Sequence, residues 1–238
     1  MTERQVKSRE RVANHGEVFT AEREVNAMLD LVKQETERID SRFLEPACGD
    51  GNFLAEILRR KLLAVEARYK KSPADYEKYA VLAATSIYGV EILQDNVEEC
   101  RRRLFAIWDE AYTAHCLAEC REEVREAVRY ILERNILCGN ALTLKQVDAA
   151  GGDTDAPIIF SEWVFTGKSS LRRSDYRLDV LMNENPDESN YRGTQNLFDE
   201  EAGDAANWMI DPETGKSIPK PVRVYPPVYY WKVQEIQN

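Results

Sequence analysis

The sequence predicts an α/β fold with a mostly parallel sheet and helices on both faces of that sheet. Short apolar runs alternate with amphipathic segments of helical spacing, and the first apolar run ends in a glycine-containing turn. Alternation of strand and helix is typical of parallel sheets joined by crossover helices. The chain has 238 residues, 43% of them hydrophobic, which is enough to bury one core of domain size.

The expected elements follow in order along the chain. Apolar residues at helical spacing predict helices over residues 22–39, 54–69, 74–86, 95–108 and 110–134. Thr20 is the expected N-cap of the first helix, and Ser72-Pro73 separates the second from the third. Short apolar runs predict four strands, one opening the segment 42–53 before its glycine turn and the others within 86–93, 135–138 and 158–165.

The last third of the chain differs in character. Residues 171–182 are basic and then apolar, residues 183–221 are polar, acidic and rich in turn formers, and residues 222–233 are aromatic. We therefore predict a core over residues 1–168, including an N-terminal helix, and an irregular acidic extension over residues 169–238. The aromatic tail has two interpretations, an edge strand that folds back on the core or a docking strand for another subunit.

The charge argues against a self-sufficient nucleic-acid binder. The chain has 32 Lys and Arg against 42 Asp and Glu, a net charge of −10, and an isoelectric point of about 5.0. Proteins that bind nucleic acid on their own are normally basic, because their affinity comes from neutralising phosphates. Contact with DNA would therefore require a very uneven charge distribution or a partner that supplies the basic surface.

Other classes are excluded on composition. No apolar run approaches the roughly 18 residues of a membrane span, and the first residues lack the apolar stretch of a signal peptide. Five cysteines without a Cys-x-x-Cys pair fit a reducing cytoplasm better than a disulfide framework. His115, Cys116 and Cys120 form the tightest cluster of metal-binding residue types, and we interpret them as ordinary packed side chains. We expect a cytoplasmic protein without a metal site.

The strongest local signal is the segment from Leu44 to Leu54, which reads LEPACGDGNFL. A strand that ends in such a turn brings backbone N–H groups and a helix N-terminus close to a ligand. Gly49 and Gly51 remove side chains that would block the approach. The segment does not match the dinucleotide-binding pattern GxGxxG, because Leu54 occupies the third glycine position.

This segment resembles the glycine motif of class I S-adenosylmethionine-dependent methyltransferases, specifically prokaryotic DNA adenine-N6 methyltransferases of restriction-modification systems. Their motif commonly reads Leu-(Asp/Glu)-Pro-Ala-Cys-Gly-Ser-Gly-Asn-Phe-Leu, and Asp50 here replaces the usual Ser. Three further stretches resemble family motifs in the same order. They are the N-terminal cofactor motif at His15–Thr20, the second-strand motif at Tyr88–Ile92 and the Gly-Asp-Ala-Leu stretch at Gly139–Leu142. The resemblance implies a Rossmann-like class I methyltransferase fold.

The resemblance also implies S-adenosyl-L-methionine as the cofactor. Glu91, at the end of a strand, offers two carboxylate oxygens to the ribose hydroxyls. Asn140 replaces the family's Asp, and its amide oxygen accepts more weakly from an adenine amino group, which predicts reduced affinity. Phe19 either covers the cofactor or packs against the following helix. The predicted cofactor-binding residues are Phe19, Thr20, Glu45, Pro46, Ala47, Cys48, Gly49, Asp50, Gly51, Phe53, Glu91, Ile92, Asn140, Ala141 and Leu142.

The catalytic motif of the family is degenerate in this chain. Adenine-N6 enzymes carry (Asp/Asn/Ser)-Pro-Pro-(Tyr/Phe/Trp) after the fourth strand, where polar groups accept from the target amino group and the ring stacks on the flipped base. Ser161–Val164 has a Ser and a Trp but no prolines, and Asn185-Pro186 lacks the second proline. Tyr225–Tyr229 contains two adjacent prolines, but the residues that flank them are in the wrong order for the motif. The catalytic residues are therefore unknown, with Ser161, Trp163 and Asn185 as weak candidates.

These features together suggest a cofactor-binding subunit of a DNA adenine-N6 methyltransferase in a restriction-modification or phage-defence system. The acidic charge and the degenerate motif suggest a hetero-oligomer, in which a partner protein provides DNA recognition and catalysis. Two alternatives stay open: a catalytically inactive cofactor-sensing or scaffolding subunit, and a stand-alone methyltransferase for a different substrate.

Overall fold

The computed structural model describes residue 11 and residues 20–183, 207–212 and 214–236. At its centre is a three-stranded parallel sheet in the order β1 (Phe43–Glu45), β2 (Ile87–Glu91) and β3 (Ile136–Cys138). Every residue of β2 is buried, because the middle strand is covered on both faces. The parallel pairing confirms the predicted α/β class for this part of the chain.

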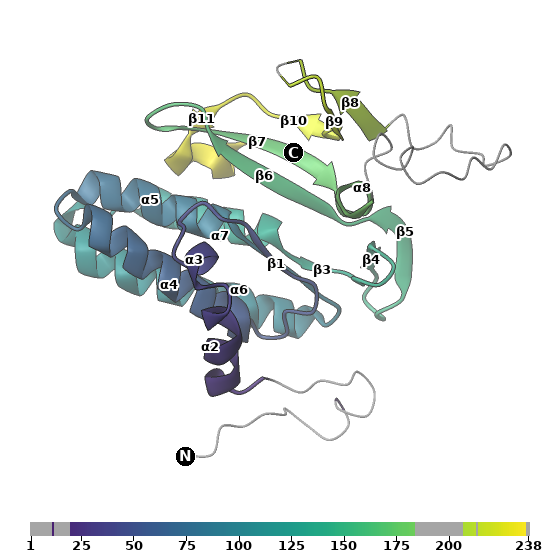
Figure 1. Cartoon of the computed structure of the whole chain (residues 1–238), viewed down its shortest axis with the longest axis horizontal. Helices are drawn as coiled ribbons and strands as arrows, with labels where there is room; N and C mark the ends of the chain where they lie inside the picture. The colour runs from purple at the N-terminus through teal and green to yellow at the C-terminus, as the bar shows by residue number, and fades with distance from the viewer. Residues whose placement is uncertain (1–10, 12–19, 184–206, 213, 237–238) are drawn as a thin grey trace, which may run out of the picture.

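Four helices pack together and cover one face of the parallel sheet (Figure 1). Ile87 and Ile136 join the apolar faces of these helices in a single core, together with Leu54 and Trp108. Two shorter helices near the N-terminus, α2 (Glu22–Asp30) and α3 (Lys33–Thr36), lie against the first of the four. The four are α4 (Asn52–Tyr69), α5 (Pro73–Thr85), α6 (Gln94–Cys116) and α7 (Glu122–Asn135).

Several helix boundaries differ from the predictions. The segment 22–39 is divided into α2 and α3, and Ala21 precedes α2 without a side-chain cap, so the predicted capping by Thr20 is wrong. Helix α6 continues past its predicted end to Cys116, because its buried face extends that far. It ends where Leu117 takes a positive φ of 48°. The predicted break at Ser72-Pro73 is confirmed, since the Ser72 hydroxyl caps α5.

A buried lysine fixes the chain that leads into β1. The ammonium of Lys61, on α4, donates to the carbonyl oxygens of Arg38 (2.8 Å), Ile39 (3.1 Å) and Ser41 (2.5 Å). Burial lowers the pKa of Lys61 to about 7. One side chain thus pairs three carbonyl groups, of which that of Ile39 also accepts from the Ser86 hydroxyl, and the position of β1 is set relative to the helices.

An antiparallel sheet covers the other face of the parallel sheet. Strand β7 (Ser170–Arg177) pairs with β6 (Ile159–Phe165) on one side and with β10 (Arg223–Val224) and β11 (Val228–Tyr229) on the other. The rings of Phe160 and Tyr88 meet edge to face with centroids 5.4 Å apart. Among the described residues, this sheet stands where the sequence predicted a second helical layer.

The hairpin of β6 and β7 explains this difference. The two strands are joined by a turn of only a few residues, and such a turn requires an antiparallel pairing, whereas a parallel strand needs a long crossover. The turn also contains the position between residues 168 and 169 where the sequence predicted a boundary, so segments on both sides of this boundary pair directly.

The remaining elements are η1 (Leu117–Glu119), β4 (Lys145–Val147), β5 (Asp153–Pro157), α8 (Leu178–Met182), β8 (Trp208–Ile210), β9 (Ser217–Pro219) and η4 (Tyr230–Glu235).

The aromatic tail folds back on the core, as one of its two interpretations predicted. Strand β11 pairs with β7, and η4 packs against α7. The Tyr230 hydroxyl donates to the buried carboxylate of Glu77 (2.6 Å), which also accepts from Tyr112 and Arg121. No helix in the described ranges is long and apolar enough to cross a membrane.

Candidate functional site

The candidate site lies where the three parallel strands end, around the turn between β1 and α4. This turn is bound to β2 because the Cys48 N–H donates to the Val90 carbonyl (3.0 Å). The Gly51 N–H donates back to the Cys48 carbonyl (2.8 Å), which closes the turn. Helix α4 therefore begins directly after the turn, with Gly51 as its N-cap and without a side-chain cap for its first N–H groups.

Two glycines make this close packing possible. Gly51 has a φ of +87°, and a Cβ at this position would lie 2.6 Å from the Sγ of Cys100 on α6. A Cβ on Gly89 in β2 would lie 2.8 Å from the Sγ of Cys48. Side chains at either position would push the turn away from the sheet, so both glycines are required by space, and Gly51 also by its backbone conformation.

Glu91 connects the turn to the ends of β2 and β3. Its side chain is buried, with the whole residue 8% exposed. One carboxylate oxygen accepts from the Gly49 N–H (2.9 Å) and the other from the Leu93 N–H (3.0 Å). Its backbone carbonyl accepts from the Gly139 N–H (3.0 Å), which follows β3. Glu91 is thus a buried carboxylate at a strand end that binds the glycine turn, and its predicted role as an acceptor for ribose hydroxyls stays a prediction.

Two ionisable groups of the turn have raised pKa values. Burial raises the pKa of Glu45 to about 7, and no charged neighbour among the described residues counters this effect. Contact with Cys100 and burial raise the pKa of the Cys48 thiol well above its usual range, which keeps that sulfur neutral. Glu45 is therefore a carboxylate that a cation placed at the strand ends would ionise.

Asn140 organises the loop after β3. Its amide nitrogen donates to Asp153 (2.9 Å), and its amide oxygen accepts from the Leu142 N–H (3.0 Å). Ala141 is half-buried, whereas the Leu142 side chain is exposed. The amide oxygen that the sequence assigns to the cofactor is therefore already engaged within its own loop.

The other predicted cofactor-binding residues surround the same turn. Asp50 lies 3.5 Å from the guanidinium of Arg103, and Phe53 packs against the helical core. The Thr20 carbonyl accepts from Asn52 (3.3 Å), which brings the start of the described chain beside α4. Pro46 and Ala47 are exposed and Ile92 is half-buried, while Phe19 lies outside the described residues.

The weak catalytic candidates have partners within the fold. The buried Ser161 hydroxyl donates to Asp175 (2.7 Å) and accepts from the Nε of Arg173 (3.0 Å). The indole N–H of Trp163 donates to Asn135 (2.9 Å). Asn185 lies outside the described residues. The catalytic assignment of these three residues stays a prediction.

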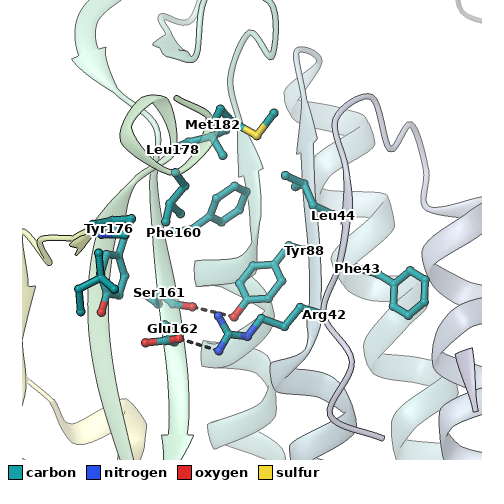
Figure 2. Close-up of a pocket in the computed structure, with 13 residues that line it drawn as sticks. Arg42, Phe43, Leu44, Tyr88, Phe160, Ser161, Glu162, Tyr176, Leu178 and Met182 are labelled. Carbon is teal, nitrogen blue, oxygen red and sulfur yellow. Dashed lines mark hydrogen bonds and ion pairs between the residues drawn. The ribbon is translucent and has the colours of Figure 1, made fainter. Parts of the chain in front are cut away.

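A cavity of about 500 Å³, which the sequence did not predict, lies beside β1. Figure 2 shows Leu44, Tyr88 and Phe160 at its wall, with the Tyr88 hydroxyl donating to the Ser161 carbonyl (3.0 Å). Arg42 and Glu162 form an ion pair (2.6 Å) along one side. The aromatic and aliphatic lining suits a planar apolar group. Its residues come from β1, β2, β6, β7, α8 and β9, so no local pattern in the sequence could have revealed it.

No metal centre is found in the described part of the chain, where no group of three or more His, Cys, Asp or Glu converges. The groups that the described residues bring to the strand ends are the glycine turn, the carboxyl groups of Glu45 and Glu91 and the N-terminus of α4.

Comparison with protein families identifies the family of the chain. The model of the MmeI DNA-methyltransferase domain matches residues 19–183, more than half of the chain. The chain belongs to this family. It is accordingly a DNA methyltransferase of the restriction-modification type. No curated protein and no solved structure matches it.

The MmeI-type domain includes more than the parallel sheet. The matched residues cover the three parallel strands, helices α4–α7, the β6–β7 hairpin and α8. All predicted cofactor-binding residues lie within them. The antiparallel hairpin, which the sequence analysis divided between two regions, is therefore part of the family domain.

Replacing Gly51 with Ala should destabilise this MmeI-type domain. We expect the free energy of unfolding to fall by about 2 kcal/mol or more, because Ala is strained at positive φ and its Cβ meets Cys100. Urea denaturation followed by circular dichroism measures the change. Gly167→Ala is the matched control, since nothing lies within 4 Å of a Cβ there, and it should change stability by less than about 0.5 kcal/mol. Equal effects of the two substitutions would contradict the packing argument.

Proposed function

We propose that this chain is the S-adenosyl-L-methionine-binding subunit of a DNA (adenine-N6) methyltransferase in a restriction-modification or phage-defence system. In this proposal a partner chain contributes DNA recognition and the catalytic tetrapeptide. The observation that carries the proposal is the buried carboxylate of Glu91, which meets the Gly49 N–H in a member of a DNA-methyltransferase family. Burying this carboxylate is favourable only if donors surround it, and a ribose diol adds two.

The residues at the strand ends fit S-adenosyl-L-methionine by their chemistry. Each carboxylate oxygen of Glu91 has a second lone pair that can accept from a ribose hydroxyl. The half-buried carboxyl of Glu45 can pair with the cationic α-ammonium group. Bound S-adenosyl-L-methionine would supply a methyl group on a sulfonium for in-line transfer to a nitrogen. The neutral thiol of Cys48 packs beneath the turn without competing for this methyl group.

The engagement of Asn140 supports a weak adenine contact. Its amide oxygen already accepts from Leu142, and its amide nitrogen already donates to Asp153. An adenine amino group would have to share that oxygen or displace the loop bond. We therefore infer that the cofactor is held mainly by Glu91 and the glycine turn.

The partner requirement rests on the catalytic candidates. Ser161 and Trp163 are bound to Asp175, Arg173 and Asn135, so neither side chain is available for a base without breaking buried contacts. These same contacts favour one alternative function, a catalytically inactive subunit that senses the cofactor or assembles a complex.

Glu91→Ala should weaken the binding of S-adenosyl-L-methionine at least tenfold, a loss of about 1.4 kcal/mol. The substitution removes the acceptors for the ribose and releases the Gly49 N–H. Isothermal titration calorimetry on the purified chain measures the affinity. Glu98→Ala, which changes an exposed glutamate on α6, should leave it within about twofold. Absence of binding by the unsubstituted chain would remove every interpretation based on this cofactor.

Binding of S-adenosyl-L-methionine should weaken as the pH falls through about 7, because protonation of Glu45 removes the charge that attracts the ammonium. In the ligand-free chain, the effect of Glu45 on the stability of the fold changes with pH in the opposite direction. A carboxyl whose folded pKa is raised from 4.5 to about 7 stabilises the fold less as the pH rises through that window. Calorimetric titrations from about pH 6 to pH 8 test this, and Glu45→Gln should flatten the dependence. If binding to Glu45→Gln had the same pH dependence as binding to the unsubstituted chain, Glu45 would be excluded as the origin of that dependence.

DNA methylation should appear only when the chain is combined with the product of a neighbouring gene. Transfer of a radiolabelled methyl group to DNA, followed by mass spectrometry of the nucleosides, measures both activity and target base. N6-methyladenine is the expected product, and a methylated cytosine would contradict the assignment. Full activity of the chain alone would exclude the partner requirement. Inactivity of the assembled complex with intact cofactor binding would favour the scaffolding alternative.

A further inference from the structure

Basic residues gather in the described part of the C-terminal region, although the chain as a whole is acidic. From residue 166 onward, the described residues include eight Lys and Arg against four Asp and Glu. The acidic surplus of the predicted extension lies in residues 184–206, outside the described ranges. The expectation of an acidic extension therefore does not hold for the part that packs on the core. The basic residues are Lys168, Arg172, Arg173, Arg177, Lys216, Lys220, Arg223 and Lys232.

Three arginines alternate with two tyrosines from α7 across β7 to β10. The guanidinium of Arg134 lies 4.9 Å from the ring centroid of Tyr130, and that of Arg173 lies 5.8 Å from the same centroid. Arg173 also lies 4.4 Å from the ring of Tyr225, and Arg223 lies 4.6 Å from that ring. We call these five residues the arginine–tyrosine ladder. Stacking on aromatic rings fixes the guanidinium planes, so their N–H groups point in set directions.

The ladder borders a cavity of about 400 Å³ between the end of β3 and the β6–β7 sheet. Arg134, Arg173 and Tyr225 line it together with Gln146, Ser161 and Cys138. The Nε atom of Arg134 is buried and has no hydrogen-bond partner among the described residues. A buried donor without an acceptor is costly, and an acceptor supplied by a ligand would remove that cost.

The charges facing the cavity favour an anion. Arg173 is paired with Asp175 (2.7 Å), so one of the two lining arginines is neutralised within the fold. Arg134 adds a positive charge, and Arg223 lies next to the lining residue Tyr225. The Ser161 hydroxyl and the Gln146 amide, which also line the cavity, already donate to Asp175 and to the Pro157 carbonyl. Among the described residues, the Nε–H of Arg134 is therefore the donor that a ligand would meet. A phosphate oxyanion matches both the charge of Arg134 and this donor.

The cavity also lies beside the candidate cofactor site. Cys138, which lines it, ends β3, and the next residue is Gly139, whose N–H binds Glu91. We propose that the cavity with the arginine–tyrosine ladder binds a backbone phosphate of the substrate DNA. This proposal rests on the proposed function, since it takes the phosphate to belong to DNA. Such a contact would position the duplex beside the cofactor without reading its sequence. It would also give an acidic chain a local basic surface for DNA.

Arg134→Gln tests the proposal in the full chain. We measure binding of a fluorescein-labelled duplex of mixed sequence by anisotropy at a series of NaCl concentrations. The substitution should weaken binding about tenfold at low salt and reduce the slope of log K against log[NaCl] by about one, because one phosphate contact is lost. Arg134→Lys should keep the slope, since it keeps the charge. Methylation and cofactor binding are measured separately, so failure of the proposed function is distinguishable from failure of this site.

The matched control is Arg102→Gln, which removes the same charge from an exposed arginine of α6 that pairs with Glu99. It should leave affinity and slope unchanged, and thermal unfolding should show that all three variants are folded. Equal effects of Arg102→Gln and Arg134→Gln, or no binding of duplex at low salt by the unsubstituted chain, would overturn the proposal. Inorganic phosphate should compete only weakly with duplex. Binding of inorganic phosphate without binding of duplex would identify a small-anion site and overturn the assignment to DNA.

Discussion

The hydrogen bonds of Glu91 are the constraint on which the geometry of the strand ends depends. Its carboxylate binds the glycine turn after β1, and its carbonyl binds the Gly139 N–H after β3. Each hydrogen bond to a charged acceptor is worth about 1.5–3 kcal/mol. One residue at the end of the middle strand therefore sets the spacing of all three strand ends, and the residues proposed to hold a cofactor are the same ones that hold this part of the fold together.

The second sheet depends on a different buried group. Arg173 binds Asp175 and Ser161 and reaches the Tyr130 hydroxyl (2.6 Å) on α7, so it joins the β6–β7 hairpin to the helical layer. Removing one member of a buried ion pair costs about 3–5 kcal/mol, because the other charge stays buried. The network thus gives Ser161 a structural partner. Arg134 lies one helical turn beyond Tyr130, and its Nε–H, which has no partner among the described residues, can donate to a ligand.

The sequence by itself determined the parallel half of the fold and the family. The runs around Leu44, Val90 and Leu137 are short and apolar, and long helical segments separate them. Because crossover helices join parallel strands, this order predicted a parallel sheet. The glycine turn was predictable because Gly49 and Gly51 carry a local signal that needs no partner. The position of Glu91 at the end of a buried strand was also predictable, while its role toward a cofactor stays a proposal.

Only the tertiary structure decided what covers the second face of the sheet and where positive charge gathers. A strand pattern over residues 159–165 does not say which strand it pairs with, and a turn of a few residues made that partner β7. The cavity beside β1 and the arginine–tyrosine ladder each combine residues from several elements. Net charge sums over the whole chain, whereas a ligand responds to the charges within about a Debye length of its site. Folding brings Arg134 and Arg223 close to the buried Arg173–Asp175 pair, so the charge around this cavity differs in sign from the net charge of the chain.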